Sequence, residues 1–237
     1  METTNHKRLL PIILLLMIFV GSAAAQIDKK PYGEWSEKEA TKILNESAWG
    51  QTQALTDTSN MTGNNRVASG QSRISDVTYV NFRIRFLSAK PIRQAFSRII
   101  ELQQKGEVSE QLAKQLYGLA NADFPDYAIV SVLCDSPSQS NKLQEANAGL
   151  YKFTTAELKP NTYLQAKGGE KIFLQEYQPP RKDGLGARFI FPRMVDGKPI
   201  LAPESGEVVF HAELPSLVVL NMRYKVKDMM FNGKMEY

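Results

Sequence analysis

Cysteine and histidine are almost missing from this sequence, and their scarcity limits the chemistry that the chain can perform. Cys134 is the only cysteine among the 237 residues, so no internal disulfide can form. His6 and His211 are the only histidines. So few ligands cannot build the usual zinc sets, and no His-Glu-x-x-His motif occurs. The sequence therefore predicts no metal site and no cofactor.

Other motifs are also absent. No dense Lys/Arg tract accompanies the formal net charge of +4, which argues against nucleic acid as a partner. No Gly-x-Ser-x-Gly elbow, Gly-rich phosphate loop or acidic calcium loop is found. Paired carboxylates for glycoside hydrolysis remain open, because such pairs are remote in sequence.

Long apolar runs are lacking everywhere except at the start of the chain. Lys7 and Arg8 precede an uncharged apolar run over residues 9–20, and Ala23 and Ala25 follow it. The strongly apolar part has about 12 residues, whereas a membrane span needs roughly 20. A charged start, a short apolar run and small-x-small residues are typical of a secretory signal peptide over residues 1–25.

Cleavage is expected between Ala25 and Gln26, which places the mature protein in the periplasm or outside the cell. His6 is removed with the signal, so His211 becomes the only histidine of the mature chain. The alternative is an uncleaved anchor, which would be the chain's only association with a membrane.

The first helix of the mature chain is predicted by a capping box. Ser36 and Glu39 have the spacing at which each side chain satisfies a free N–H group of the other residue. Apolar residues at helical spacing extend the helix to about Ser47. Trp35 and Trp49 flank it and are expected to cover the core.

Two terminal segments, 35–49 and 227–234, resemble segments of uncharacterised exported bacterial envelope proteins. The resemblance implies an envelope location and brings no activity with it.

The core is predicted as a β-α-α-β unit. Residues 77–87 alternate as a half-buried strand, with Arg83 and Arg85 interpreted as solvated charges on its outer face. Pro91 and Ser109 fit the starts of two helices. Residues 127–134 form an apolar run that is typical of a central strand.

The rest of the chain divides into a polar segment and a strand-rich part. Residues 50–75 are rich in Thr, Ser, Asn, Gln and Gly, and we expect them to be irregular. After Pro160, short strands are separated by turn signals, and the signal at residues 167–170 predicts a hairpin of strands 162–166 and 171–177. The predicted fold is α+β, with an N-terminal helix, the β-α-α-β core and an antiparallel C-terminal sheet. Residues 26–75 form the helix and polar segment, and residues 76–237 form a single domain.

Cys134 and His211 are the two candidate catalytic residues. A thiolate nucleophile needs an electropositive surrounding, yet Asp135 follows Cys134 directly. A small buried cysteine is therefore the favoured interpretation. Alternation places His211 on the exposed side of its strand.

The sequence favours an exported, non-enzymatic protein that binds a protein or envelope component. Many short strands imply free strand edges that could accept another strand. The alternative is a small exported enzyme, such as a hydrolase, that uses Cys134 or a carboxylate pair.

Overall fold

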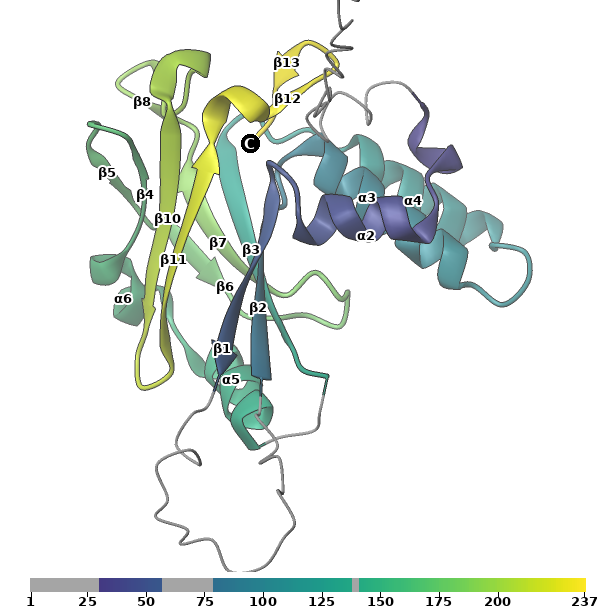
Figure 1. Cartoon of the computed structure of the whole chain (residues 1–237), viewed down its shortest axis with the longest axis horizontal. Helices are drawn as coiled ribbons and strands as arrows, with labels where there is room; N and C mark the ends of the chain where they lie inside the picture. Colours follow the sequence, from purple (N-terminus) through teal and green to yellow (C-terminus); the bar gives the residue numbers. More distant parts are fainter. Residues whose placement is uncertain (1–29, 57–78, 138–140) are drawn as a thin grey trace, which may run out of the picture.

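Two antiparallel sheets face each other, and a group of helices lies beside them in an α+β fold (Figure 1). The computed structural model describes residues 30–56, 79–137 and 141–237. Sheet A has the strand order β1-β2-β3-β7-β6, and sheet B has the order β11-β10-β4-β5. The strands of sheet A are β1 (Gly50–Thr56), β2 (Tyr79–Phe86), β3 (Tyr127–Asp135), β7 (Ala187–Pro192) and β6 (Glu176–Gln178). Those of sheet B are β11 (Val218–Lys225), β10 (Glu207–Leu214), β4 (Thr162–Ala166) and β5 (Lys171–Phe173).

The helices come from three parts of the chain. They are α2 (Glu37–Asn45), α3 (Lys90–Gln103), α4 (Glu110–Asn121), α5 (Asn141–Lys152) and α6 (Thr155–Leu158). Short 3-10 turns are η1 (Tyr32–Glu34), η3 (Lys159–Asn161), η4 (Pro203–Ser205) and η5 (Val226–Asp228). Two small hairpins complete the fold: β8 (Met194–Val195) with β9 (Lys198–Pro199), and β12 (Met230–Phe231) with β13 (Lys234–Met235). Within the described ranges, none of these helices has the length and apolar character needed to cross a membrane.

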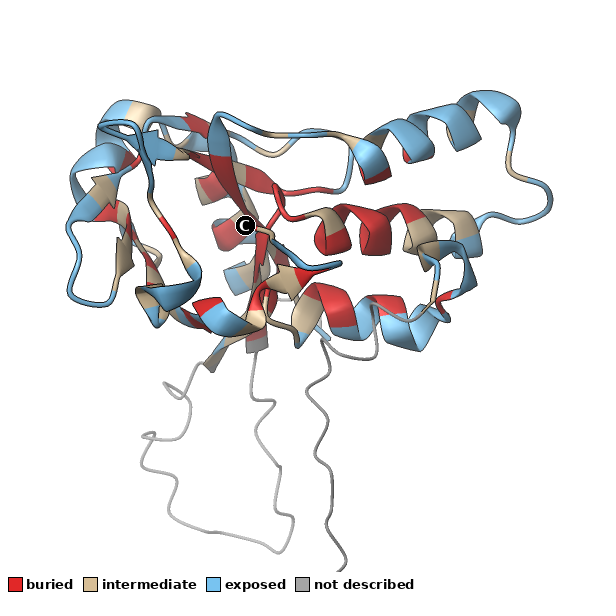
Figure 2. Ribbon diagram, turned by 90° about the horizontal axis from the view of Figure 1, so that it is seen from above, coloured by how far each residue is buried: buried red, intermediate tan, exposed pale blue. Residues whose placement is uncertain are grey.

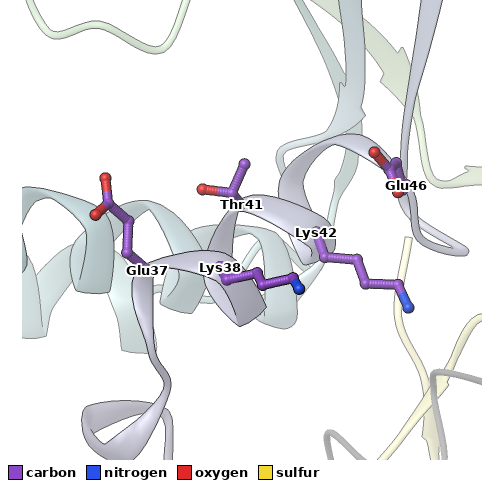
Figure 3. Close-up of a pocket in the computed structure, with 5 residues that line it drawn as sticks. All are labelled: Glu37, Lys38, Thr41, Lys42 and Glu46. Atoms are coloured by element: carbon purple, nitrogen blue, oxygen red, sulfur yellow. The ribbon is translucent and has the colours of Figure 1, made fainter.

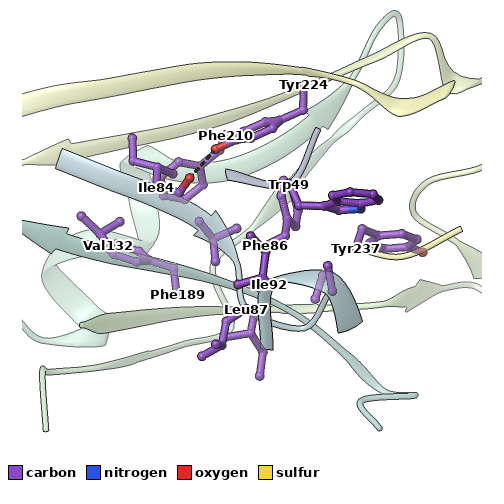
Figure 4. Packing of buried hydrophobic residues seen from close by; sticks show 14 of the residues in the cluster. Trp49, Ile84, Phe86, Leu87, Ile92, Val132, Phe189, Phe210, Tyr224 and Tyr237 are labelled. Atoms are coloured by element: carbon purple, nitrogen blue, oxygen red, sulfur yellow. Dashed lines mark hydrogen bonds between the residues drawn. The ribbon is translucent and has the colours of Figure 1, made fainter. Parts of the chain in front are cut away.

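The core lies between the inner faces of the two sheets. Aromatic side chains meet there, with the ring centroids of Phe189 and Phe210 5.5 Å apart and those of Phe86 and Tyr224 5.0 Å apart. The Tyr224 hydroxyl donates to the carbonyl oxygen of Ile84 at 3.0 Å and so joins sheet B to sheet A (Figure 4). Burying aromatic rings of this size is a major stabilising contribution to such a sandwich.

The helices α2, α3 and α4 lie together beside the strands of sheet A (Figure 1). Burial is concentrated in the strands and the first half of α3, whereas α4 is mostly exposed (Figure 2). The predicted capping box is confirmed: the Glu39 N–H donates to the Ser36 hydroxyl, and the Glu39 carboxylate accepts from the Ser36 N–H. The prediction that Trp35 and Trp49 are buried is confirmed as well.

The β-α-α-β core is confirmed as β2-α3-α4-β3, and its two strands are antiparallel neighbours. The prediction of an irregular segment over 50–75 is wrong for residues 50–56, which form β1 and pair with β2 along its whole length. Polar residues can form this strand because the side chains of Gln51 and Gln53 bond to the backbone of β11. Residues 57–75 lie outside the described residues, as do residues 1–25 of the predicted signal.

Candidate functional site

Cys134 lies in the core of the sandwich. It is opposite Phe82 in the register of β2 and β3, so its thiol belongs to the inner face of sheet A. The residue is 7% exposed. Burial, with a further contribution from Asp135, raises the pKa of the Cys134 thiol to about 12. A thiol that stays protonated in an apolar core is a poor nucleophile and fits the role of a packing residue.

His211 lies on the outer face of sheet B. Its ring stacks on Tyr163 with a centroid distance of 4.8 Å, and its Nε2 is 3.6 Å from a Glu213 carboxylate oxygen. The Lys171 ammonium lies 4.2 Å from the centroid of the Tyr163 ring. The structure therefore does not bring His211 and Cys134 together. Cys134 faces the core from sheet A, whereas His211 lies on the outer face of sheet B.

The candidate functional site is a row of polar residues across the outer face of sheet A. In the strand register, Arg85 of β2 is opposite Ser131 of β3, and Ser131 is opposite Arg188 of β7. We call these three residues the arginine row. Residues directly opposite each other in antiparallel strands have Cβ atoms about 5 Å apart, so Ser131 lies between the two arginines.

Helix α2 holds the Arg85 end of the row. The Arg85 Nε donates to the Leu44 carbonyl oxygen at 3.0 Å, and Nη2 donates to the Asn45 side-chain oxygen at 2.7 Å. The guanidinium also lies 5.0 Å from the centroid of the Phe96 ring. The interpretation of Arg85 as a solvated charge is wrong, because α2 and α3 cover this end of the sheet and leave the residue 5% exposed.

The loop that precedes β7 holds the Arg188 end. Asp183 accepts from Arg188 Nη2 and, through its other oxygen, from the Leu185 N–H at 3.0 Å. Burial pushes the pKa of Asp183 upward, but these hydrogen bonds outweigh it and leave the pKa below its ordinary value. The loop returns close to β3 at Gly186, where φ is +83° and a Cβ would lie 2.4 Å from the Val132 carbonyl oxygen. Glycine is therefore required there.

Three buried polar atoms of the arginine row have no hydrogen-bond partner among the described residues: Arg85 Nη1, Ser131 Oγ and Arg188 Nη1. Ser131 is completely buried. Among the described residues, no carboxylate forms an ion pair with Arg85. Burial, and next the charge of Arg83, lower the pKa of Arg85 to about 10. Because buried polar groups are almost always hydrogen-bonded, such a concentration of unsatisfied atoms makes this row the candidate functional site.

The polar residues around Arg83, next to the arginine row on the same face of sheet A, form hydrogen bonds with one another. Arg83 donates to the Asp135 carboxylate from Nε at 2.7 Å and from Nη2 at 3.2 Å, and its Nη1 donates to the Thr52 hydroxyl at 2.9 Å. Asn81 also donates to Asp135. Arg83 is half-buried and ion-paired, so its interpretation as a solvated charge is also wrong. The pairing satisfies this row internally and leaves the arginine row as the unsatisfied one.

A second surface feature is a hollow of about 420 Å³ along α2 (Figure 3). Its lining residues are exposed and of mixed charge: Glu37, Lys38, Thr41, Lys42 and Glu46. No lining side chain is desolvated, so this surface lacks the preorganised polar groups of a selective site.

In the described part of the chain, no three His, Cys, Asp or Glu side chains are grouped in a way that could hold a metal ion. Comparison of the chain with protein-family models, with curated proteins and with solved structures finds no match in any of the three.

Sequence reasoning placed Arg85 on the correct face of its strand but missed the site. The residues that cover Arg85 come from α2 and α3, and Arg188 comes from a strand more than 50 residues after Ser131 in the chain. The sequence holds one signal that could have indicated the site. Arg85 and Arg188 each stand at an outward position of a strand, next to residues that the pattern places in the core.

Proposed function

We propose that the chain is an exported protein that acts by binding a ligand or envelope partner rather than by catalysis. The observation that carries the proposal is the arginine row, a set of buried donors without partners on the outer face of sheet A. Donors held in place by α2 and by Asp183 are preorganised, which lowers the cost of ordering them on binding.

Strand addition, the mode suggested by the sequence, has less support. Gln53 accepts from the Asn221 N–H and donates to the Val219 carbonyl, and Gln51 donates to the Arg223 carbonyl, so these side chains occupy the open edge of β11. At the other side of the molecule, the Tyr177 N–H on β6 donates to the Thr155 hydroxyl. Edges covered in this way are protected against pairing with another chain.

Export is part of the proposal and rests on the signal-like residues 1–25. Fractionation of the producing cells, with intact-mass analysis, should recover a species that begins at Gln26 outside the cytoplasm. A full-length species confined to the membrane fraction would contradict cleavage and make residues 9–25 an anchor.

Binding is tested with the mature protein carrying a fluorescent label and with isolated cell envelopes. We expect saturable association that an excess of unlabelled protein displaces. Association that rises linearly with concentration and resists displacement would count against a specific binding function.

A further inference from the structure

We propose that Trp49, Lys90 and Arg193 form a binding site for an acidic residue followed by an aromatic residue. In the free protein, Glu236 and Tyr237 occupy this site and keep it closed. We call these two residues the strap, and the three residues that receive them the strap site. The inference goes beyond the proposed function, because it uses none of the residues of the arginine row.

The strap is held by three hydrogen-bond donors from separate parts of the chain. The Trp49 indole Nε1 donates to the Glu236 carbonyl oxygen at 2.8 Å. The Lys90 N–H, in the first turn of α3, donates to a Glu236 carboxylate oxygen at 2.9 Å. Arg193 Nη2 donates to the main-chain oxygen of Tyr237 at 2.7 Å. The donors thus converge on two consecutive residues, and Figure 4 shows Trp49 and Tyr237 close together.

Each residue of the strap meets a group that selects its chemistry. The Glu236 carboxylate lies at the start of α3, where free N–H groups and the helix dipole favour a negative charge. The Tyr237 residue is 3% exposed, and the Arg193 guanidinium lies 4.1 Å from the centroid of its ring in a cation–π arrangement. An acidic residue followed by an aromatic residue is therefore the sequence that fits.

Contacts outside the strap hold the strap site in shape. Arg193 Nη1 donates to the Phe124 carbonyl oxygen at 2.9 Å, which fixes the guanidinium. Trp49 is fully buried, and its ring meets that of Phe231 edge-on at a centroid distance of 6.3 Å. Removing the strap would leave the donors of Trp49, Lys90 and Arg193 without these acceptors, which is costly for buried groups. The opened site should therefore bind a segment of matching chemistry from another molecule.

The test uses the mature protein shortened to end at Met235, and the peptide Lys-Met-Glu-Tyr, which repeats residues 234–237. Calorimetry should show saturable binding, and the melting temperature should rise with the concentration of peptide. The peptide Lys-Met-Gln-Tyr lacks the charge at the helix start and should bind about fivefold more weakly. Lys-Met-Glu-Ala lacks the ring and should bind about tenfold more weakly. Absence of binding, or equal binding of the three peptides, would overturn the proposal.

The complete mature protein tests whether the strap closes the site. An attached segment competes at an effective concentration of about a millimolar, so the peptide should bind the complete protein at least about tenfold more weakly than the shortened one. Equal affinity for the two proteins would show that the strap and the peptide do not share a site, and would refute the closed state.

Tyr237→Ala gives a test that does not require the shortened chain to fold. The substitution loosens the strap without removing it, so the peptide should bind this variant about fivefold more tightly than the wild type. Tyr117→Ala is the matched control, because Tyr117 lies on α4 outside the strap site and is 66% exposed. It should bind the peptide as weakly as the wild type does. If Tyr237→Ala also binds no better than the wild type, the strap does not close the site and the inference is wrong.

Discussion

Burial of the Cys134 thiol should make the folded protein less stable at alkaline pH. Its pKa rises from 9.0 to about 12 on folding, chiefly through burial. A pKa that is higher in the folded state gives stability that is complete below pH 9 and is lost as the pH rises toward 12. We therefore predict that the free energy of unfolding falls over this range, and falls less steeply in Cys134→Ala.

Denaturant unfolding at a series of pH values, followed by circular dichroism, measures this difference. Burial raises the pKa values of Tyr177 and Tyr224 in the same direction, so the comparison with Cys134→Ala isolates the thiol. Parallel stability curves for the two proteins would show that Cys134 does not contribute.

Arg85 illustrates at one residue what the sequence can and cannot specify. The two-residue period of β2 is enough to place Arg85 on the outer face of the strand, because its neighbours Ile84 and Phe86 face inward. Its exposure depends instead on α2 and on Phe96, which come from other parts of the chain. Periodicity gives the face of a residue, whereas burial follows from tertiary packing that no local pattern contains.

Among the elements, α2 has the most complete local sequence signal. The capping box of Ser36 and Glu39 satisfies free N–H groups at its start. We predict that Ser36→Ala lowers the free energy of unfolding by about 1 kcal/mol. Urea denaturation measures this loss, and Lys38→Ala on the exposed side of the same helix should change it little. An equal effect of the two substitutions would contradict the capping role.

The same capping box should be sensitive to acid. Hydrogen bonds from the Ser36 backbone and hydroxyl, together with Lys30, lower the pKa of Glu39 from 4.5 to about 2. A pKa that is lower in the folded state gives stability that is present above pH 4.5 and is lost as the pH falls toward 2. In Ser36→Ala this acid-dependent loss should be smaller, and denaturation between neutral pH and pH 2 measures it. A loss of the same size in both proteins would show that the Ser36 hydroxyl, the only group that the substitution removes, does not help to lower the pKa of Glu39.

The contact between β1 and β11 is made by glutamine side chains instead of strand pairing. Gln53 makes two hydrogen bonds to β11, at 2.9 and 3.0 Å. We predict that Gln53→Ala lowers the free energy of unfolding by about 1 kcal/mol and promotes self-association through the uncovered edge. Urea denaturation and sedimentation velocity measure the two effects.

Gln165→Ala is the control for Gln53→Ala. Gln165 is also a strand glutamine with a side-chain bond to a backbone carbonyl, in this case Gly169 at 3.0 Å, but it covers no sheet edge. It should leave the protein as monodisperse as the wild type. Association in both variants, or in neither, would argue against an edge-protecting role for Gln53.

At the scale of the whole molecule, the sequence specified the class of fold better than its topology. The turn signal at residues 167–170 predicts a hairpin whose second strand covers residues 171–177. The hairpin is confirmed for residues 171–173, which form β5 and pair with β4 in sheet B, but β6 begins at Glu176 in sheet A. Leu174 is fully buried at this crossing. An apolar residue at such a position fits a strand and a crossing equally well, so the partition of the strands between two sheets could not be deduced from the pattern.

The fold should unfold as one unit, because a single cluster of buried residues extends from the helices through both sheets. Phe210 is fully buried in sheet B and contacts Phe189 and Phe191 of sheet A. We predict that Phe210→Ala lowers the free energy of unfolding by about 3–5 kcal/mol. The exposed Phe173 is the control, and its change to alanine should cost less than about 0.5 kcal/mol.

Two probes can test whether this loss is shared by the helices and the sandwich. Trp35 precedes α2, and Trp49 follows it and contacts Phe231 of β12, so tryptophan fluorescence reports on the packing around α2. Far-ultraviolet circular dichroism reports on the whole fold. In Phe210→Ala both transitions should move to the same lower denaturant concentration, as expected for two-state unfolding. A fluorescence transition that stays at the wild-type midpoint would mean that the helices unfold independently of the sandwich. The hydrogen bonds of Arg85 to α2 would then be too weak to couple the helices to the sheet.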